Sequence, residues 1–234
     1  MRALTIETSA RTGSIAAVED ARVVAEEEFE HGLQHAAQII PIIDRLCRAR
    51  GWTPRDLNEL YVSAGPGSFT GLRIGVTLAK TMALATGVKL VAVPTARVLV
   101  ENAPPDARHV VLVLDAKRDQ IFTARFERDA TGTWIEREPA HLDSLVAMLA
   151  RASRPVHLLG EGIPYHEKFI PRDDAGVIVT PAELWRPRAR IVAAIGGQMA
   201  RAGQFADPDR LTPIYLRIPE AEEKWEQQKQ RAKK

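Results

Sequence analysis

The sequence has a single cysteine, almost no net charge and no long apolar run. Cys47 stands alone among 234 residues, which excludes an internal disulfide and a cysteine-based zinc site and suits a reducing cytoplasm. The net charge of +2 is too small to indicate nucleic-acid binding by itself. The best candidate for a membrane span, residues 74–93, carries Lys80 and Lys89, and polar residues interrupt the first ten positions. We therefore expect a cytoplasmic protein with no signal peptide and no membrane contact.

The residues that are present have the composition of an ordinary soluble globular chain, with 45% hydrophobic and 26% charged residues. In the first half, strand patterns alternate with helix patterns. Strands are expected at 3–6, 13–18, 22–29, 60–63 and 89–93, and helices at 34–50, 72–85 and 95–101. Gly51 is expected to end the first helix as its C′ residue.

A loop rich in proline and charge, residues 102–109, is the best candidate for a domain boundary, and the pattern starts afresh beyond it. Strands are expected at 110–114, 120–126, 132–135 and 156–159, and helices at 141–150 and 191–202. Because both halves begin with a strand meander, we predict a duplicated α/β architecture with lobes at 1–105 and 106–234. The tail after Pro219 is polar and highly charged.

Residues 64–73, AGPGSFTGLR, join a strand pattern to a helix pattern. The glycines of this tight turn allow its backbone to approach a neighbour closely, either a phosphate at the helix N-terminus or another polypeptide. The third glycine comes one residue too late for the dinucleotide motif GxGxxG, and Gly71 is followed by Leu72 rather than by the lysine of a Walker A loop. The turn therefore favours polypeptide contact.

The helix after the turn carries a ridge of small residues at every fourth position: Gly71, Gly75, Ala79 and Ala83. Such a ridge allows a second helix to approach closely, or it packs against the sheet of its own chain. The first helix is apolar over a wide arc, which includes Ile42 and Leu46. Together the two helices could form a four-helix bundle with a partner that offers the same pair. The predicted partner-binding residues are His35, Ile39, Ile40, Ile43, Leu72, Arg73, Gly75, Val76, Ala79, Lys80 and Ala83.

Several segments, in this order along the whole chain, resemble the bacterial TsaB (YeaZ) family. They are residues 4–9 (LTIETS), 35–44 (HAAQIIPIID), 65–75 (GPGSFTGLRIG), 114–118 (LDAKR), 160–162 (GEG) and 213–217 (PIYLR). The resemblance implies an α/β fold with two related lobes of the actin-like ATPase (ribonuclease H-like) superfamily. It also implies a role in making N6-threonylcarbamoyladenosine beside the tRNA anticodon. In that family the catalytic subunit is a homologue, TsaD, with which TsaB pairs, and a small ATPase, TsaE, joins them.

The resemblance further implies that this chain is not catalytic alone. The catalytic homologue binds metal through an HxxxH pair, and the matching positions here are about Thr95 and Leu99, which are no ligands for that site. His31 and His35 have the same spacing, but no glutamate follows the first histidine, and we expect no metal site there. We expect no tightly bound cofactor, ATP use by the complex, tRNA contact through the complex, and a possible homodimer.

The main alternative is a self-sufficient actin-like ATPase or a carbamoyl-type transferase. It would use Glu7 and Ser9, where actin-like ATPases have their first phosphate loop, and Asp115 at the matching place in the second lobe. Each position also reads as an ordinary turn at a strand end. Lysines in the tail could touch tRNA phosphates, but glutamates are interleaved with them, so a solvated tail is the preferred interpretation.

Overall fold

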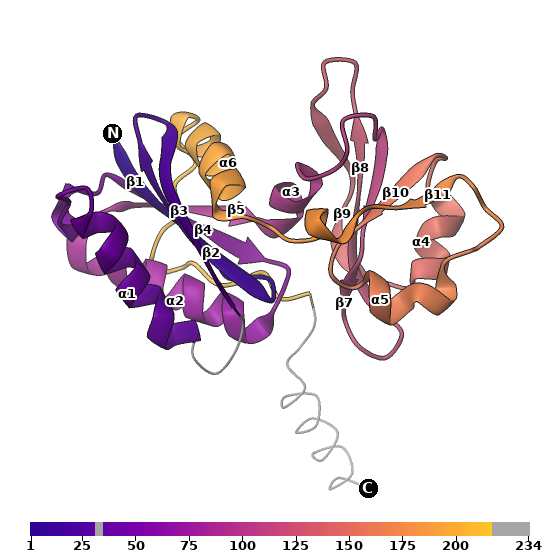
Figure 1. The fold of residues 1–234 in the computed structure, drawn as a ribbon, viewed down its shortest axis with the longest axis horizontal. Coiled ribbons are helices and arrows are strands. Elements are labelled where there is room, and N and C mark those ends of the chain that lie inside the picture. Colours follow the sequence, from indigo (N-terminus) through magenta and orange to yellow (C-terminus); the bar gives the residue numbers. More distant parts are fainter. Residues whose placement is uncertain (31–34, 217–234) are drawn as a thin grey trace, which may run out of the picture.

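A computed structural model describes residues 1–30 and 35–216 and shows two sheets side by side, each with helices against it (Figure 1). The first sheet has the strand order β3-β2-β1-β4-β5. Its strands are β1 (Arg2–Glu7), β2 (Thr12–Glu19), β3 (Arg22–Glu30), β4 (Glu59–Gly65) and β5 (Lys89–Pro94). The first three strands form the expected antiparallel meander, and β1, β4 and β5 run parallel.

Helices cover both faces of this sheet because its central strands are apolar on both sides. On one face, Leu4 and Leu60 pack with α1 (His35–Arg48) and α2 (Phe69–Thr86). On the other, Tyr61 packs with α6 (Ala189–Arg201). The α1 helix ends as predicted, since Gly51 has φ +66°. The α2 helix begins earlier than predicted, because the Ser68 hydroxyl accepts a hydrogen bond from the Gly71 N–H and caps it at residue 69.

The second sheet has the order β11-β10-β6-β8-β7, and β9 pairs with β8. Its strands are β6 (His109–Leu112), β7 (Leu114–Asp115), β8 (Ile121–Arg128), β9 (Trp134–Asp143), β10 (Val156–Leu159) and β11 (Val177–Val179). Shorter helices accompany it and the connections: α3 (Thr95–Val100), α4 (Leu145–Arg151), α5 (Ile163–His166), η1 (Pro54–Asp56), η2 (Glu167–Phe169) and η3 (Ala182–Leu184).

The helix predicted at residues 141–150 begins four residues later than expected. Residues 141–143 are the end of β9, where Asp143 pairs with Ile121 of β8. Ser144 then caps α4 by accepting a hydrogen bond from the Ala147 N–H at 3.2 Å. The prediction of a helix is therefore confirmed for residues 145–150, while residues 141–143 extend β9 instead.

The chain returns to the first sheet at its end. The Thr5 hydroxyl donates to the Ala189 carbonyl at 3.1 Å, and the Ala189 N–H donates to the Ser14 hydroxyl at 2.8 Å, which fix the start of α6 on β1 and β2. Farther along, the Ile214 N–H donates to the Ala64 carbonyl at 2.7 Å. The predicted lobes, 1–105 and 106–234, divide the chain at one point. In the structure, α6 and the described segment after it pack with the first lobe instead (Figure 1).

Candidate functional site

The glycine turn packs against the end of β1. The Ser68 N–H donates to the Ser9 carbonyl at 2.7 Å. A Cβ atom at Gly67 would lie 2.3 Å from that carbonyl oxygen, and one at Gly71 would lie 1.9 Å from the Thr8 carbonyl oxygen. Side chains at these positions cannot fit, because the two backbone segments are already in contact. The close neighbour of the turn is therefore a segment of this chain itself, and the predicted contact of the turn with another polypeptide stays a prediction.

Glu7 lies beneath this contact, with no exposed surface. Its carboxylate accepts hydrogen bonds from the N–H and the hydroxyl of Ser9, both at 2.5 Å, and from the Ser63 hydroxyl. Burial raises the pKa of Glu7, and the hydrogen bonds from Ser63 and Ser9 oppose this shift only in part. The donors that would hold a phosphate at this turn are thus bound to a carboxylate of the chain itself, so the geometry does not favour Glu7 and Ser9 as reacting groups.

Asp115 ends β7 and is held in a turn. Its carboxylate lies 3.0 Å from the Lys117 ammonium and accepts the Lys117 N–H at 3.1 Å, and His166 Nε2 lies 3.3 Å away. Partial burial acts to raise the pKa of Asp115, but hydrogen bonds from Lys117 and His166 outweigh it and lower the pKa. The contacts with Lys117 hold the turn and the contact with His166 ties it to α5, which favours the structural interpretation.

The two positions that match the metal pair of the catalytic homologue carry no ligand. The Thr95 hydroxyl accepts the Gly65 N–H at 3.1 Å, and Leu99 is fully buried in the apolar core. Within residues 1–30 and 35–216 no group of three potential metal ligands comes together. The spacing of His31 and His35 cannot be assessed, because residues 31–34 and the His35 side chain lie outside the described residues.

Most of the small-residue ridge faces the chain's own core. Among the predicted partner-binding residues, those buried within the lobe are Ile39, Leu72, Gly75, Val76, Ala79 and Ala83. A Cβ at Gly75 would lie 2.2 Å from the Thr8 hydroxyl oxygen, so the smooth ridge allows α2 to approach the end of β1. This arrangement matches the second interpretation of the ridge. A bulky residue at Gly75 or Ala83 would therefore disturb the fold of the chain itself.

Other residues of the two helices remain exposed. Ile40 is 61% exposed on α1 and Leu84 is 62% exposed on α2, while Ile43 is half-buried. Arg73 lies 5.2 Å from the ring centroid of Phe69. Lys80 is partly buried, and its ammonium donates to the Leu211 carbonyl at 2.9 Å. Phe69 and Leu84 are exposed apolar residues outside the predicted partner-binding set, because both lie away from the small-residue ridge on which much of that prediction depends.

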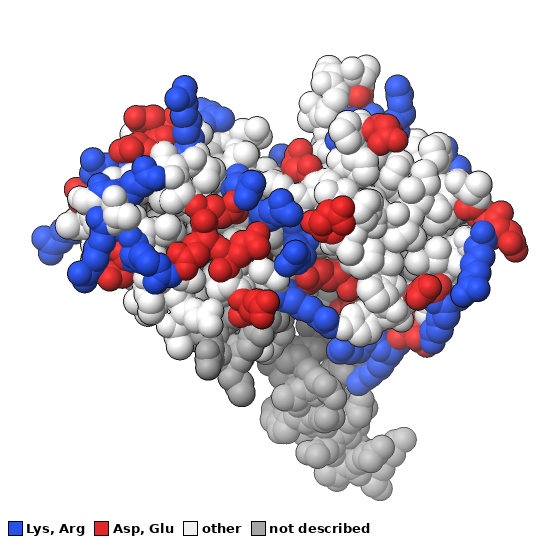
Figure 2. Space-filling view, in the orientation of Figure 1, with Lys and Arg blue, Asp and Glu red and all other residues white. Residues whose placement is uncertain are grey.

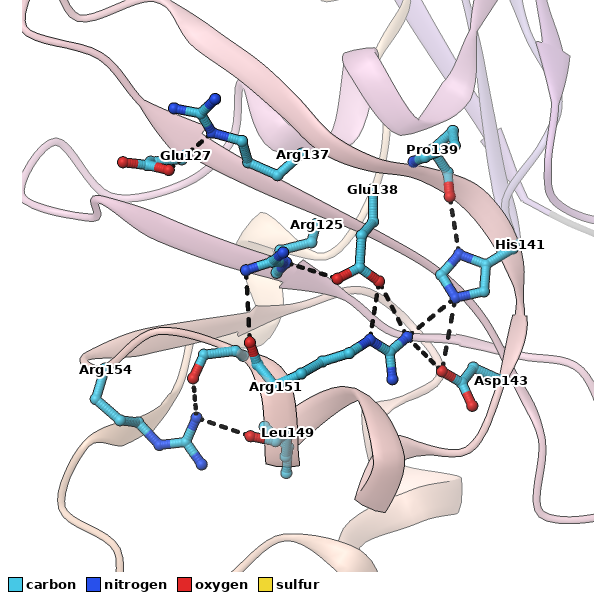
Figure 3. Close-up of polar contacts among 11 residues, drawn as sticks. Arg125, Glu127, Arg137, Glu138, Pro139, His141, Asp143, Leu149, Arg151 and Arg154 are labelled. Atoms are coloured by element: carbon cyan, nitrogen blue, oxygen red, sulfur yellow. Dashed lines mark hydrogen bonds and ion pairs between the residues drawn. The ribbon is translucent and has the colours of Figure 1, made fainter.

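In the second lobe, a cluster of charged side chains joins α4 to the β8–β9 hairpin (Figure 3). Arg151 binds Glu138 at 3.0 Å and also Asp143, and Arg125 lies 2.9 Å from Glu138. The two guanidinium groups and the two carboxylates balance in charge, and they point toward one another rather than into a cavity (Figure 3). We interpret this cluster as a structural tie.

Comparison with known proteins identifies the family. A family model described as "TsaD: tRNA N6-adenosine threonylcarbamoyltransferase" matches residues 30–225. A protein of Bacillus subtilis named "tRNA threonylcarbamoyladenosine biosynthesis protein TsaB" is 32% identical over 229 residues, which are 96% of this chain and 98% of that protein. The chain belongs to the TsaB (YeaZ) family. The resemblance seen in the sequence is thereby confirmed.

Other members agree in length and fold. An Escherichia coli protein of the same name is 27% identical over 93% of this chain and 95% of its own length. The solved structure described as "YeaZ from Pseudomonas aeruginosa" matches 92% of this chain and 99% of its own with a TM-score of 0.76, at 20% identity. The predicted α/β fold with two lobes is confirmed. Among the described residues, no helix is long and apolar enough to cross a membrane.

Proposed function

We propose that this TsaB family member is the non-catalytic partner subunit in the synthesis of N6-threonylcarbamoyladenosine beside the tRNA anticodon. The observation that carries the proposal is similarity along almost the full length to proteins named for that biosynthesis. Two features of the site support a non-catalytic role. Leu99 replaces a metal ligand with an apolar core residue, and the Glu7 carboxylate is buried and bonded within the chain.

The partner is a TsaD-like catalytic homologue, with a TsaE-like ATPase joining the complex. ATP is used by the complex, and tRNA is bound through it. The docking surface on this chain is the exposed side of α1 and α2, defined by Ile40, Phe69, Arg73 and Leu84. Ile40, Phe69 and Leu84 are apolar side chains with 61%, 37% and 62% exposure, and burial of such residues drives association. Arg73 adds a charged group beside Phe69.

Reconstitution tests the catalytic part of the proposal. The purified chain, the TsaD-like homologue and the TsaE-like ATPase are mixed with ATP, the other substrates and unmodified tRNA, and each protein is omitted in turn. The modified nucleoside should form in the full mixture and not with this chain alone. Product formation by this chain alone, or undiminished formation in its absence, would refute the proposal and favour a self-sufficient enzyme.

Size-exclusion chromatography tests the docking surface. Ile40→Glu and Leu84→Glu should each weaken heterodimer formation by roughly a hundredfold, because each buries an unpaired charge in an apolar contact. Val146→Glu is the matched control, since Val146 is an apolar residue with 56% exposure on α4 of the second lobe. Wild-type heterodimer formation by both α1 and α2 variants would exclude this surface. A homodimer that the same variants dissociate would instead show two copies pairing through it.

A further inference from the structure

Arginine side chains gather where the chain crosses from the second lobe to the first. Arg186 and Arg188 lie on the segment before α6, and Arg11 lies on the turn between β1 and β2. A shallow cleft is lined by Thr12, Gly13, Ser14, Glu28, Arg186, Pro187 and Arg188. Blue side chains follow the boundary between the lobes in Figure 2. We refer to Arg11, Arg186, Arg188, Lys117 and Tyr165 as the seam surface.

Among the described residues, the guanidinium groups of the seam arginines are held in place without carboxylate partners. Arg186 Nη1 donates to the Thr12 hydroxyl at 2.9 Å, and Arg188 Nη2 donates to the Glu183 carbonyl at 3.3 Å. The Arg11 guanidinium lies 5.4 Å from the ring centroid of Tyr165. Within the part of the chain that the structure describes, none of the three forms an ion pair. Most of their N–H donors therefore remain available to an anion.

Basic residues near the seam surface do form ion pairs with carboxylates. Arg190, two residues beyond Arg188, pairs with Glu26 at 2.5 Å, and Lys168 pairs with Asp119 at 2.9 Å. Carboxylates of the chain thus neutralise the basic residues on either side, and Asp115 pairs with Lys117 within the seam surface at 3.0 Å, but the guanidinium groups of Arg11, Arg186 and Arg188 have no such partner among the described residues. A guanidinium held by a neutral contact keeps its full charge and its planar fork, which matches the geometry of a phosphate group.

An exposed aromatic ring completes the surface. Tyr165 is 47% exposed, and two cations lie over its ring: Arg11 at 5.4 Å and Lys117 at 5.6 Å from the centroid. Arg11 comes from the first lobe and the other two residues come from the second, so the ring and its cations bridge the boundary. Aromatic rings interleaved with basic groups are typical of surfaces that bind the backbone and stack the bases of single-stranded nucleic acid.

Acidic residues border this surface. Glu28 lines the same cleft, and β3 also carries Glu26, Glu27 and Glu30. Glu161 lies at the lobe boundary as well, where its carboxylate accepts the Arg11 N–H at 3.1 Å. The β3 carboxylates repel phosphates, so an RNA strand at the seam surface would be kept off the edge strand, while the Glu161 carboxylate weakens the attraction beside Arg11.

We propose that the seam surface binds the phosphate backbone of tRNA in the assembled complex. The inference rests on the proposed function, which supplies a tRNA substrate, and extends it by naming the contact surface on the non-catalytic chain. RNA is favoured over an acidic protein because guanidinium forks and an exposed ring on one surface match phosphates and bases together.

The test measures binding of an unmodified tRNA transcript to the complex of this chain with the TsaD-like homologue over a series of salt concentrations. Arg11→Ala and Arg188→Ala should each weaken binding on the order of fivefold and reduce the slope of log K against log salt by about 0.7 to 0.9. Arg186 is left unchanged because it also ties the crossing segment to Thr12.

Two further variants complete the test, the first as a matched control and the second with an effect of opposite sign. Arg55→Ala removes one exposed positive charge on η1, near the start of β1 and away from the lobe boundary, and should leave the salt slope unchanged. Glu28→Gln should strengthen binding, since it removes a repelling carboxylate from the cleft. All variants should unfold at the temperature of the wild type and form the heterodimer.

The possible results of these measurements distinguish a failure of this inference from a failure of the proposed function. If the wild-type complex binds the transcript and makes the modified nucleoside, while Arg11→Ala and Arg188→Ala bind it equally well, the seam surface is refuted and the proposed function stands. If the two arginine variants fold but lose the heterodimer, the surface contacts protein rather than RNA, which also overturns the inference. A wild-type complex that neither binds tRNA nor forms the product would refute the proposed function itself.

Discussion

Glu7 occupies the turn for which the sequence left a phosphate loop open as an interpretation. The carboxylate supplies the negative charge, and the Ser9 N–H, the Ser9 hydroxyl and the Ser63 hydroxyl supply the donors. From the sequence, the Glu-Thr-Ser turn could be read as a phosphate loop or as a plain turn. The hydrogen bonds from Ser9 and Ser63 to the buried Glu7 carboxyl group favour the plain turn.

Replacement of Glu7 by glutamine should change how stability depends on pH. Burial raises the pKa of Glu7, so the folded state binds this proton more tightly than the unfolded state. The contribution of Glu7 to stability is therefore present below the unfolded pKa near 4.5 and is lost as the pH rises through the folded pKa. Urea unfolding from pH 4.5 to 8 should show Glu7→Gln gaining stability relative to the wild type as the pH rises. Glu30→Gln, on the exposed edge strand, is the control, and parallel wild-type and Glu7→Gln curves would contradict the argument.

Helix α6 offers a comparison between two adjacent glycines. A Cβ at Gly196 would lie 2.6 Å from the Tyr61 ring, whereas at Gly197 the nearest atom would be a flexible Arg201 nitrogen at 3.6 Å. Gly196→Ala should destabilise the chain by about 1 to 3 kcal/mol through overpacking. Gly197→Ala should stabilise it by roughly 0.5 to 1 kcal/mol through helix propensity. Denaturant unfolding measures both, and equal effects would show that α6 does not pack on Tyr61 as described.

The tie between α4 and the β8–β9 hairpin depends on Arg151 (Figure 3). Arg151→Ala leaves Glu138 and Asp143 without this partner and should cost about 1 to 2 kcal/mol at neutral pH. Partial burial acts to raise the pKa of Asp143, but the bonds from Arg151 and Ser144 lower it. The stabilisation is thus present above the usual carboxyl pKa, and the difference from the wild type should shrink as the pH falls through the folded pKa.

Arg137→Ala serves as the control for this cluster. Arg137 pairs with Glu127 at 2.8 Å with both side chains well exposed, so its loss should cost less than about 1 kcal/mol. Chemical unfolding at pH 7 and at pH 3 gives both comparisons. An Arg151→Ala effect no larger than that of Arg137→Ala would mean that the cluster contributes nothing beyond ordinary surface pairs.

At the level of elements, the sequence predicts best where apolar residues form a helical stripe or a continuous buried run. The periodicity of α1 and the apolar runs of β1, β4 and β6 led to correct assignments. Strand β9 was predicted too short because most of its residues after Trp134 are polar and at least partly exposed, so they show no alternation. The ridge of α2 was predicted as a feature but not by its contact, since small residues at every fourth position suit a partner helix and the chain's own strand equally.

The first lobe contains segments from early and from late in the chain, because α6 packs on the sheet formed by β1 to β5. The sequence alone does not show that these distant segments lie together. Two crossings join the lobes, residues 101–108 and 184–188, and Asn102 ties one to the other. Its side-chain amide donates to the carbonyls of Leu184 at 3.0 Å and Arg186 at 2.7 Å. The Arg186 side chain in turn donates to Thr12 of the first sheet. The second crossing is therefore tied to the first crossing by Asn102 and to β2 by Arg186.

Asn102→Ala should therefore loosen the junction without unfolding either lobe. The variant leaves the carbonyls of Leu184 and Arg186 without their side-chain donor, at a cost of about 1 to 3 kcal/mol where they stay shielded from water. Hydrogen exchange followed by mass spectrometry should show faster exchange in residues 184–190 and 12–14, while β4 and β10 keep the wild-type rate. Ser144→Ala is the control, because it removes a cap from α4 within the second lobe and should speed exchange there alone. Uniformly faster exchange across both lobes in Asn102→Ala would instead show that the two crossings and the lobes unfold as one unit.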